Sequence, residues 1–396
     1  MAKINYPEII LKNGREASLL RGHPWVFSGA IAGIKGQPSD GDVVLARDSR
    51  GQMLALGFFN SLTDIAFRVI TRDCEKVVDA AFWNERVQAA LELRLRLVNA
   101  KTNAYRLINA EGDGCPGLIV DVYNNTQVIS ITTAGMEGQK QNILDALIFH
   151  LKPAGIYEQS AGRSRGLEGL QESRGFIYGD DQRSAVRIME NGYQFDVDFI
   201  GGQKTGFFLD QRGNREKIGA LSCGRTVLNC FCYTGAFSVY AVAGGAKKVV
   251  SLDISKSACA AVSEHLRLNG LPVDDHPVIE TDVFQYLRDL RESFDLIILD
   301  PPAFAKTKRD VSKASRGYKE INMQAMKHLN RGGMLATFSC SNFIEEDLFY
   351  KIVQGAARDA QADLQLLDRF SAGPDHPLAL GHPEGRYLKG LLVRKY

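Results

Sequence analysis

The chain has 396 residues, and at about 150 residues per domain this length predicts two or three domains, enough for a large core. Hydrophobic residues make up 45% and charged residues 24% of the sequence, which excludes a disordered, collagenous or coiled-coil chain. The 48 basic and 46 acidic residues give a net charge of +2, so total charge neither requires nor excludes a nucleic-acid partner.

The sequence also bears on where the protein works. We find no window of about 18 apolar residues that could span a membrane. Residues 1–7 lack the apolar core and cleavage site of a secretory signal. The seven cysteines are odd in number and irregularly spaced, which is typical of reduced thiols. We therefore expect a cytoplasmic protein with no membrane partner, in which one cysteine could be reactive.

The first part of the chain has the pattern of a small all-β domain. Apolar-alternating runs separated by turns predict strands at residues 25–27, 42–46, 54–59 and 65–70. After a boundary near residues 74–78, helical periodicity covers residues 79–99. Further on, residues 104–187 combine a predicted helix at 139–150 with predicted strands at 104–108, 118–123 and 128–132. These residues therefore predict a second, compact α/β unit.

The rest of the chain alternates strands and helices regularly, which is typical of a parallel, doubly wound sheet. The predicted strands are 226–232, 248–253, 277–281, 296–300, 334–339 and 389–394. The predicted helices are 236–243, 257–268, 283–290, 315–329 and 345–357. We therefore expect three domains, at residues 1–75, 76–193 and 194–396. Ligands of such sheets bind beyond the carboxyl ends of the strands, so the residues there are site candidates.

Residues 112–117 match the G-x-G-x-x-G pattern of dinucleotide-binding loops. That fingerprint requires a helix after its glycines. Here Pro116 precedes the run 118–123, which has the pattern of a strand. We therefore expect no cofactor at this segment.

Three successive strands of the C-terminal part end in residues suited to a nucleoside. Gly235 joins the first strand directly to a helix and allows a ligand to approach the backbone closely. Asp253 ends the second strand, where an acid can accept both hydroxyls of a ribose. Asp282 follows the third strand, in position to face an adenine edge. A single such acid is often only a helix cap, but the three together resemble the class I S-adenosylmethionine methyltransferases.

The fourth and fifth strands end in candidate catalytic residues. Pro301 and Pro302 make a rigid turn after Asp300, and this turn can hold the edge of a flat base. Cys340 follows the neighbouring strand. Carbon 5 of a pyrimidine is too weak a nucleophile to take a methyl group directly, but a thiolate that adds to carbon 6 activates it. We therefore predict Cys340 as the nucleophile and Asp300 as the group that binds the cytosine, which must be unpaired or flipped out.

Two basic segments accompany these strand ends. Lys204 and Arg212 lie in a loop before the first strand, and Lys306 begins a run of cations that extends to residue 319. A basic run is most often a solvated face, but beside a base pocket it would contact phosphates. The predicted substrate-binding residues are Lys204, Arg212, Pro301, Pro302 and Lys306. We expect no metal ion.

Motifs along the whole chain match one known family. They are Gln-Lys-Thr-Gly and Asp-Gln-Arg at 203–206 and 210–212, Asn-Cys-Phe and Tyr-Thr-Gly at 229–231 and 233–235, Asp-Pro-Pro at 300–302, and Pro-Glu-Gly-Arg-Tyr-Leu-Lys at 383–389. The chain thus resembles the ribosomal RNA large-subunit methyltransferase I family, bacterial enzymes that make 5-methylcytosine in 23S RNA. Residues 21–27 are similar to the start of that family's PUA domain, and residues 111–121 to its central domain.

The resemblance implies an α/β fold with a C-terminal class I (Rossmann-like) sheet, preceded by a PUA-like β-barrel and a small central α/β domain. It implies 23S ribosomal RNA as the partner and leaves a homodimer open. The implied cofactor is S-adenosylmethionine, bound by Asn229, Phe231, Tyr233, Gly235, Asp253 and Asp282. Related RNA cytosine-5 enzymes often have a cysteine where this chain has Pro302, so the adduct must be released without a second thiol.

Other functions remain compatible with the sequence. The aromatic residue near the Asp-Pro-Pro turn also resembles turns of N-methyltransferases, which would act here on a purine of ribosomal RNA. A non-catalytic RNA-binding ribosome assembly factor could use the same PUA-like segment. A nicotinamide oxidoreductase is a further use of a doubly wound sheet, but the single-glycine turn at Gly235 disfavours it.

Overall fold

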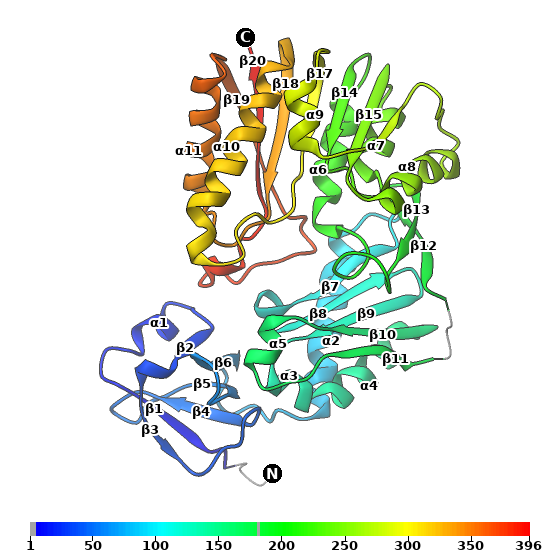
Figure 1. Ribbon diagram of the computed structural model, residues 1–396. Helices are drawn as coiled ribbons and strands as arrows, with labels where there is room; N and C mark the ends of the chain where they lie inside the picture. The colour runs from blue at the N-terminus through cyan, green and yellow to red at the C-terminus, as the bar shows by residue number, and fades with distance from the viewer. Residues whose placement is uncertain (1–4, 180–182) are drawn as a thin grey trace. The chain divides into compact units, whose positions relative to one another are not determined.

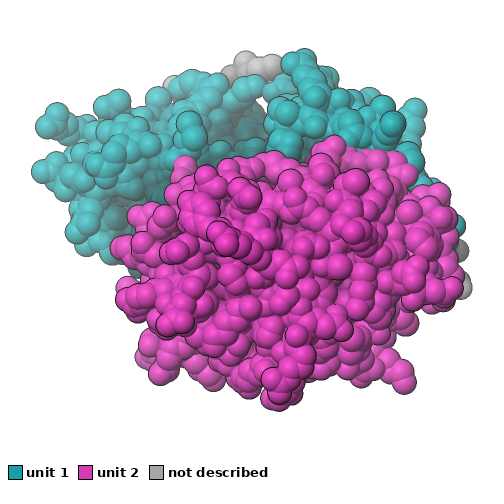
Figure 2. Space-filling view, turned by 90° about the horizontal axis from the view of Figure 1, so that it is seen from above, with its two compact units in different colours: residues 1–189, 197–207, 374–385 teal, residues 190–196, 208–373, 386–396 magenta. Residues whose placement is uncertain are grey.

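The computed structural model describes residues 5–179 and 183–396; residues 1–4 and 180–182, which belong to the first two predicted domains, lie outside the described residues. The described chain forms two compact units, coloured separately in Figure 2. Unit 1 comprises residues 1–189, 197–207 and 374–385, and unit 2 comprises residues 190–196, 208–373 and 386–396. None of the described helices is both long and apolar enough to cross a membrane.

The N-terminal part of unit 1 is a six-stranded sheet, counted within the described residues, with the order β2-β6-β5-β4-β1-β3. Its elements are β1 (Glu8–Leu11), α1 (Ala17–Leu20), β2 (Trp25–Phe27), β3 (Ile31–Lys35), β4 (Val43–Arg47), β5 (Met53–Phe59) and β6 (Ile65–Thr71). Ile9, Val44 and Phe67 are fully buried and belong to one apolar core. All four strands predicted here are present, whereas β1 and β3 were not predicted because they are short and lack clear alternation.

The second part of unit 1 combines α2 with a five-stranded sheet, again within the described residues, of order β11-β10-β9-β8-β7. Helix α2 (Ala80–Leu97) begins after Asp79, whose side chain accepts a hydrogen bond from the Phe82 amide at 3.0 Å. The other elements are β7 (Ala104–Asn109), β8 (Leu118–Tyr123), β9 (Thr126–Ile131), α3 (Ala134–Gly138), α4 (Lys140–Leu151), β10 (Gly155–Ser160), α5 (Arg163–Leu167) and β11 (Ser173–Tyr178). The predicted strands and helix of this segment are therefore present.

The glycine pattern at residues 112–117 is followed by strand β8 and not by a helix, as predicted. A Cβ atom at Gly112 would lie 1.9 Å from the backbone oxygen of Pro377, and one at Gly114 would lie 2.1 Å from Nη1 of Arg86. At Gly112 the backbone of Pro377 leaves no room for a side chain, and at Gly114 a φ of 67° favours glycine. These glycines are packing positions of unit 1.

Unit 2 contains a seven-stranded sheet of order β16-β15-β14-β17-β18-β20-β19, counted within the described residues (Figure 1). Its strands are β14 (Thr226–Cys230), β15 (Lys248–Asp253), β16 (Val278–Glu280), β17 (Phe294–Leu299), β18 (Leu329–Ser339), β19 (Leu364–Ser371) and β20 (Lys389–Lys395). Its helices are α6 (Arg212–Leu221), α7 (Ala236–Ala243), α8 (Lys256–Leu268), α9 (Val283–Asp289), α10 (Val311–Lys327) and α11 (Glu346–Asp359). A hairpin of β12 (Ala185–Glu190) and β13 (Tyr193–Asp198) contributes residues to both units.

The strand order reverses between β14 and β17, which pair in parallel. At such a switch point the loops after the two strands diverge to opposite faces and leave a crevice for a ligand. The loop after β14 contains Gly235, and the loop after β17 begins with Asp300. The topology therefore places these two predicted site residues at one edge of the sheet.

The last strand in the chain differs from the prediction of a parallel sheet. β20 lies between β18 and β19 and is antiparallel to both. Because its direction is reversed, its first residue, Lys389, is aligned with Ser339 at the carboxyl end of β18. Helix α6 and strand β19 were not predicted either, since α6 is rich in polar residues and most of β19 is exposed or half-buried.

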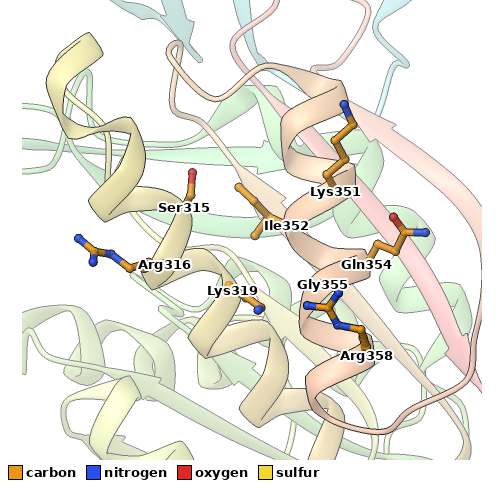
Figure 3. Close-up of a pocket in the computed structure, with 8 residues that line it drawn as sticks. All are labelled: Ser315, Arg316, Lys319, Lys351, Ile352, Gln354, Gly355 and Arg358. Atoms are coloured by element: carbon orange, nitrogen blue, oxygen red, sulfur yellow. The ribbon is translucent and has the colours of Figure 1, made fainter.

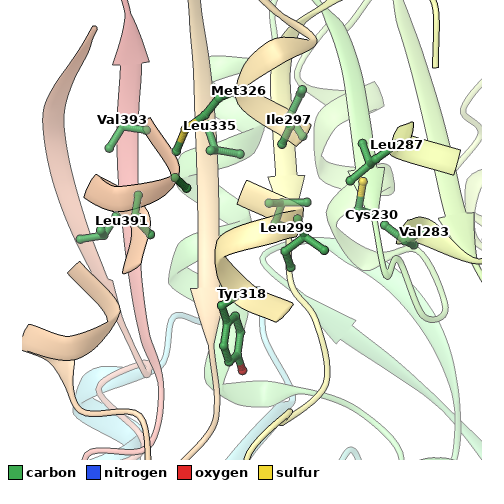
Figure 4. Packing of buried hydrophobic residues seen from close by; sticks show 14 of the residues in the cluster. Cys230, Val283, Leu287, Ile297, Leu299, Tyr318, Met326, Leu335, Leu391 and Val393 are labelled. Carbon is green, nitrogen blue, oxygen red and sulfur yellow. The ribbon is translucent and has the colours of Figure 1, made fainter. Parts of the chain in front are cut away.

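One face of the seven-stranded sheet packs against α9, α10 and α11 through apolar side chains (Figure 4). Leu299, Leu335 and Tyr318 are fully buried within this cluster. Burial of one such side chain stabilises the fold by about 1.5–3 kcal/mol. The core therefore fixes the strands whose carboxyl ends carry the predicted site residues.

Candidate active site

The loop after β14 has a strained backbone. Phe231, Tyr233 and Gly235 have φ angles of 58°, 48° and 80°, all in the left-handed region. For a residue other than glycine this conformation costs about 1–2 kcal/mol. Two hydrogen bonds hold the loop: the amide of Cys232 donates to Leu252 O and that of Tyr233 to Asp253 Oδ2, both at 2.9 Å. Strain of this kind is typical of loops that clamp a ligand.

Asp253 is half-buried at the end of β15, beside this loop. Its Oδ2 accepts from Tyr233 and its Oδ1 accepts from the Ser255 amide at 2.9 Å. A carboxylate offers about four acceptor positions, so both oxygens retain capacity for a ligand's hydroxyl groups. Ile254 follows directly and is 71% exposed, although it is a large apolar residue. Our sequence reasoning missed Ile254; the available signal was an apolar residue immediately after the strand-ending acid. The carboxylate of Asp253 suits the ribose of a nucleoside, and the exposed side chain of Ile254 suits its base.

Asn229 and Asp282 have contacts within the protein. Asn229 is buried, and its Nδ2 donates to Ser238 Oγ at 2.9 Å, which connects β14 with α7. The Asp282 side chain accepts from the Gln285 amide at 2.9 Å and caps α9. These contacts give both residues a structural role, and their contact with a cofactor stays a prediction.

We expect Gly235→Ala to destabilise unit 2 by about 2–4 kcal/mol, because it adds left-handed strain to overpacking. The new Cβ would lie 2.7 Å from Cγ1 of Val262, at a φ of 80°. Thermal and urea unfolding of the purified variant measure the loss. The matched control is Gly213→Ala, at a helical position with nothing within 4 Å of the added atom. Equal unfolding midpoints for Gly235→Ala and the wild type would contradict the prediction.

The structure brings the two predicted catalytic residues to adjacent strand ends. Asp300 is half-buried after β17, and Gln211 Nε2 donates to its Oδ2 at 3.1 Å. Gln211 is in turn held by Asn214, whose Nδ2 donates to Gln211 Oε1 at 2.6 Å. Cys340 follows β18, and its Sγ lies 3.9 Å from the backbone oxygen of Pro301. The thiol therefore lies beside the turn that carries the carboxylate.

Cys340 differs from the other cysteines near the sheet. Cys230 and Cys232 are buried, and burial raises the pKa of both thiols well above the ordinary value. Such thiols stay protonated and are poor nucleophiles. Cys340 is half-buried at the edge where ligands of this fold bind. Its position therefore suits a reactive thiol.

The predicted substrate-binding residues are distributed over both units. Pro301 is buried and Pro302 is exposed, in the turn after β17. Lys306 is exposed on the loop that follows, whereas Arg212 is buried at the start of α6. Lys204 is exposed and belongs to unit 1, and its contact with the RNA stays a prediction.

A basic groove of about 700 Å³ lies between α10 and α11 (Figure 3). Its lining is Ser315, Arg316, Lys319, Lys351, Ile352, Gln354, Gly355 and Arg358. Asp359, beside the groove, contacts Lys319 at 2.5 Å and Arg358 at 3.4 Å. Arg316 and Lys319 belong to the predicted basic run, whereas Lys351 and Arg358 were missed because they lie on the next helix. The sequence does carry a signal for these two residues: Lys351 and Arg358 are two helical turns apart, so they lie on the same face of α11.

Unit 1 joins three of the motifs that carry the family resemblance. His23 Nε2 lies 3.3 Å from a carboxylate oxygen of Glu384, and the rings of Trp25 and His382 meet edge to face at 4.4 Å. Trp25 Nε1 also donates to Glu111 Oε1 at 2.8 Å. The segment 374–385 thus packs with the N-terminal sheet and the glycine-rich segment.

Comparison with known proteins identifies the family. Residues 129–394 match the family model of S-adenosylmethionine-dependent methyltransferases, and residues 9–72 match that of PUA-like domains. The chain is 45% identical over 390 residues to Ribosomal RNA large subunit methyltransferase I of Aeromonas salmonicida, covering 98% of each chain. It is 44% identical to the protein of that name from Photobacterium profundum, covering 96% of this chain and 98% of the relative.

A solved structure shows the same fold. The crystal structure of SMU.776 complexed with SAH aligns with a TM-score of 0.85 and 24% identity, over 98% of this chain and 99% of that one. The predicted fold, a class I methyltransferase sheet preceded by a PUA-like domain, is confirmed. The prediction of a methyltransferase that uses S-adenosylmethionine is confirmed as well, which argues against a nicotinamide oxidoreductase. The chain belongs to the S-adenosylmethionine-dependent Ribosomal RNA large subunit methyltransferase I family.

Proposed function

We propose that the protein methylates carbon 5 of a cytosine in 23S ribosomal RNA, in the cytoplasm, with Cys340 as nucleophile. The observation that carries this proposal is the 3.9 Å distance between Cys340 Sγ and the backbone oxygen of Pro301. It places a half-buried thiol beside the turn that begins with Asp300. The names of the relatives, which refer to large-subunit ribosomal RNA, support the choice of substrate.

S-adenosylmethionine supplies an electrophilic methyl group when bound. The Asp253 carboxylate would accept the ribose hydroxyls with the acceptor capacity that its two backbone bonds leave. The exposed side chain of Ile254 would pack against the adenine ring. Phe231, Tyr233 and Gly235 would shape the loop that faces the cofactor, and Asn229 and Asp282 would line the same site.

The protein's own residues account for most of the proposed chemistry. The Cys340 thiolate forms a bond to carbon 6 of the cytosine, which makes carbon 5 nucleophilic. Asp300, oriented by Gln211, accepts a hydrogen bond from the amino group of the cytosine, and its protonated form donates a proton to the ring nitrogen as negative charge develops there. After methyl transfer the proton at carbon 5 passes to a base, and the bond between sulfur and carbon 6 breaks. Because Pro302 stands where related enzymes have a cysteine, this release uses no second thiol.

Nucleoside mapping tests the proposed reaction. Digested 23S RNA from a strain that lacks the gene should lose one 5-methylcytidine, detected by mass spectrometry. The purified protein should restore it on that RNA in the presence of S-adenosylmethionine. Loss of an N-methylated purine instead would favour the N-methyltransferase and overturn the cytosine assignment. Light scattering of the purified protein decides whether it is a homodimer.

We also propose that phosphates of the RNA bind along the basic groove between α10 and α11. Both helices begin at the carboxyl edge of the sheet, α10 after the loop from Asp300 and α11 after the loop from Cys340. The groove has four cations beside the single carboxylate of Asp359, and this net positive charge is complementary to a phosphodiester backbone. An RNA strand whose base enters the proposed pocket would therefore continue along this groove.

We expect the double variant Arg316→Glu, Lys351→Glu to raise the KM for RNA about tenfold or more at low salt, because two phosphate contacts become repulsive. The kcat at saturating RNA should change little, since neither side chain belongs to the proposed catalytic pair. The salt dependence of binding should also weaken, by about one in the logarithmic slope for each lost contact. Steady-state kinetics at several salt concentrations measure both effects.

Arg331→Glu is the matched charge reversal for this experiment. Arg331 is exposed in the amino-terminal part of β18, away from the edge that carries Cys340. Equal KM values for the double variant and for Arg331→Glu would rule out the groove as an RNA contact.

A further inference from the structure

Lys389 is a buried cation that the proposed mechanism does not use. It is only 6% exposed, and its Nζ donates to the backbone oxygens of Ser341 at 2.7 Å and Ile344 at 2.6 Å. Burial lowers the pKa of this ammonium group to about 8. Removing a charge from water is costly unless a partner compensates it. The buried charge of Lys389 is therefore expected to have an anionic or polar partner nearby.

The reversed direction of β20 determines where this charge lies. Lys389 is the first residue of β20 and is aligned with Ser339, the residue before Cys340. The two carbonyls that it binds belong to the segment directly after Cys340. The ammonium group thus lies under the loop that presents the thiol, and the two groups interact electrostatically.

Other charged and titratable groups around Lys389 are weaker candidates. Glu346 of α11 also interacts with Lys389, but it is exposed and bound to Arg369 Nη1 at 2.7 Å. Tyr318 of α10 contacts Ser341 Oγ at 3.0 Å with its hydroxyl, and burial raises the pKa of that hydroxyl. A thiolate at Cys340 is therefore the anion best placed to balance the buried charge.

We infer that Lys389 is a positioning residue that fixes the Cys340 loop and stabilises the thiolate at Cys340. The inference rests on the proposed role of Cys340 as nucleophile. The thiolate is the reactive form of cysteine, and a nearby cation increases its population. Two carbonyl hydrogen bonds hold the ammonium group in place, so it acts as a fixed charge in a region of low dielectric. As a buried residue, Lys389 acts through Cys340 and the backbone of its loop.

Alkylation of Cys340 with iodoacetamide tests the inference without any RNA. We expect Lys389→Gln to slow alkylation at pH 7 about tenfold or more, because an opposite charge beside a titratable group is lost. Mass spectrometry of the peptide that contains Cys340 gives the rate. Lys389→Arg, which keeps the charge, should recover most of the rate. Cys223, which is exposed, serves as the internal control and should react equally in all variants.

The pH dependence separates the electrostatic role from a purely structural one. The lysine is protonated below pH about 8. The difference in alkylation rate between wild type and Lys389→Gln should therefore be largest below this pH and should disappear above it. A loop that is merely displaced would lower the rate by one factor at every pH. That result, or an unchanged rate at pH 7, would overturn the inference.

A reciprocal measurement keeps the inference testable if Lys389→Gln does not fold. Coupling between two sites is mutual, so removing the thiol should lower the pKa of Lys389 further. An NMR titration of the lysine side chain in Cys340→Ala against wild type measures this shift. An unchanged titration would overturn the inference. Neither experiment depends on which base is methylated, so failure of the proposed reaction would appear separately, in the nucleoside map.

Discussion

Methyl transfer to 23S ribosomal RNA should fall on the order of 10⁴-fold when Cys340 is replaced by alanine. Without the thiolate, carbon 5 of the cytosine cannot become a sufficiently strong nucleophile. The position of the thiol at 3.9 Å from Pro301 O makes it the cysteine best placed for this attack. Initial rates with radiolabelled S-adenosylmethionine and RNA from the gene-deleted strain measure the loss.

Two controls make this result specific to the chemistry. Cys223→Ala removes an exposed thiol of unit 2 and should leave the rate unchanged. Calorimetric titration should show that Cys340→Ala still binds S-adenosylmethionine, because Cys340 is not among the predicted cofactor residues. Undiminished methyl transfer by Cys340→Ala would overturn the nucleophile assignment and favour methylation at a nitrogen.

Asp300→Asn should lower kcat by about 10²–10³-fold, the typical effect of losing one group that stabilises developing charge. The substitution keeps the size of the side chain and can still contact Gln211, which now donates to Asp300 Oδ2 at 3.1 Å. It removes the negative charge and the ability to share a proton with the base. Single-turnover rates at saturating RNA measure the chemical step directly.

Asp363→Asn provides the matched control for Asp300→Asn. Asp363 is exposed just before β19, and its backbone oxygen accepts from the Tyr396 amide. Its side chain is thus outside the proposed site, and the rate should stay at the wild-type value. A rate for Asp300→Asn within a factor of two or three of that control would show that the carboxylate does not act on the base.

The regular strands and helices of unit 2 could be predicted because turn-forming residues separate its apolar runs. Strand 248–253 and helix 236–243 were predicted with the bounds that the structure has. Both are apolar, and glycine residues separate them. The position of Asp253 and Asp300 at one edge of the sheet could be predicted because strand ends in this fold meet there. The pattern of the sequence and the geometry of the sheet therefore led to the same candidates.

Features that depend on partners distant in sequence could not be predicted. Helix α6 is rich in polar residues, which in the sequence resemble those of a loop. One of them, Arg215, is buried in an ion pair, with its Nη2 2.6 Å from Glu190 Oε2, and this partner cannot be read from the local pattern. The direction of β20 depends on pairing with β18 and β19, for which its own residues carry no signal. The burial of Lys389 follows from that pairing. Sequence patterns report local periodicity, whereas these features arise from tertiary packing.

The placement of β20 also affects the order in which the protein can fold. Residues 389–395 form an inner strand between β18 and β19, although they are made after every other strand of the sheet. While a chain grows on the ribosome, domains complete at its N-terminal side can fold first. The catalytic sheet, in contrast, keeps unpaired edges on β18 and β19 until residue 395 has been synthesised. A nascent chain should therefore acquire its RNA-modifying activity only after β20 has been synthesised, and a truncation before β20 should aggregate.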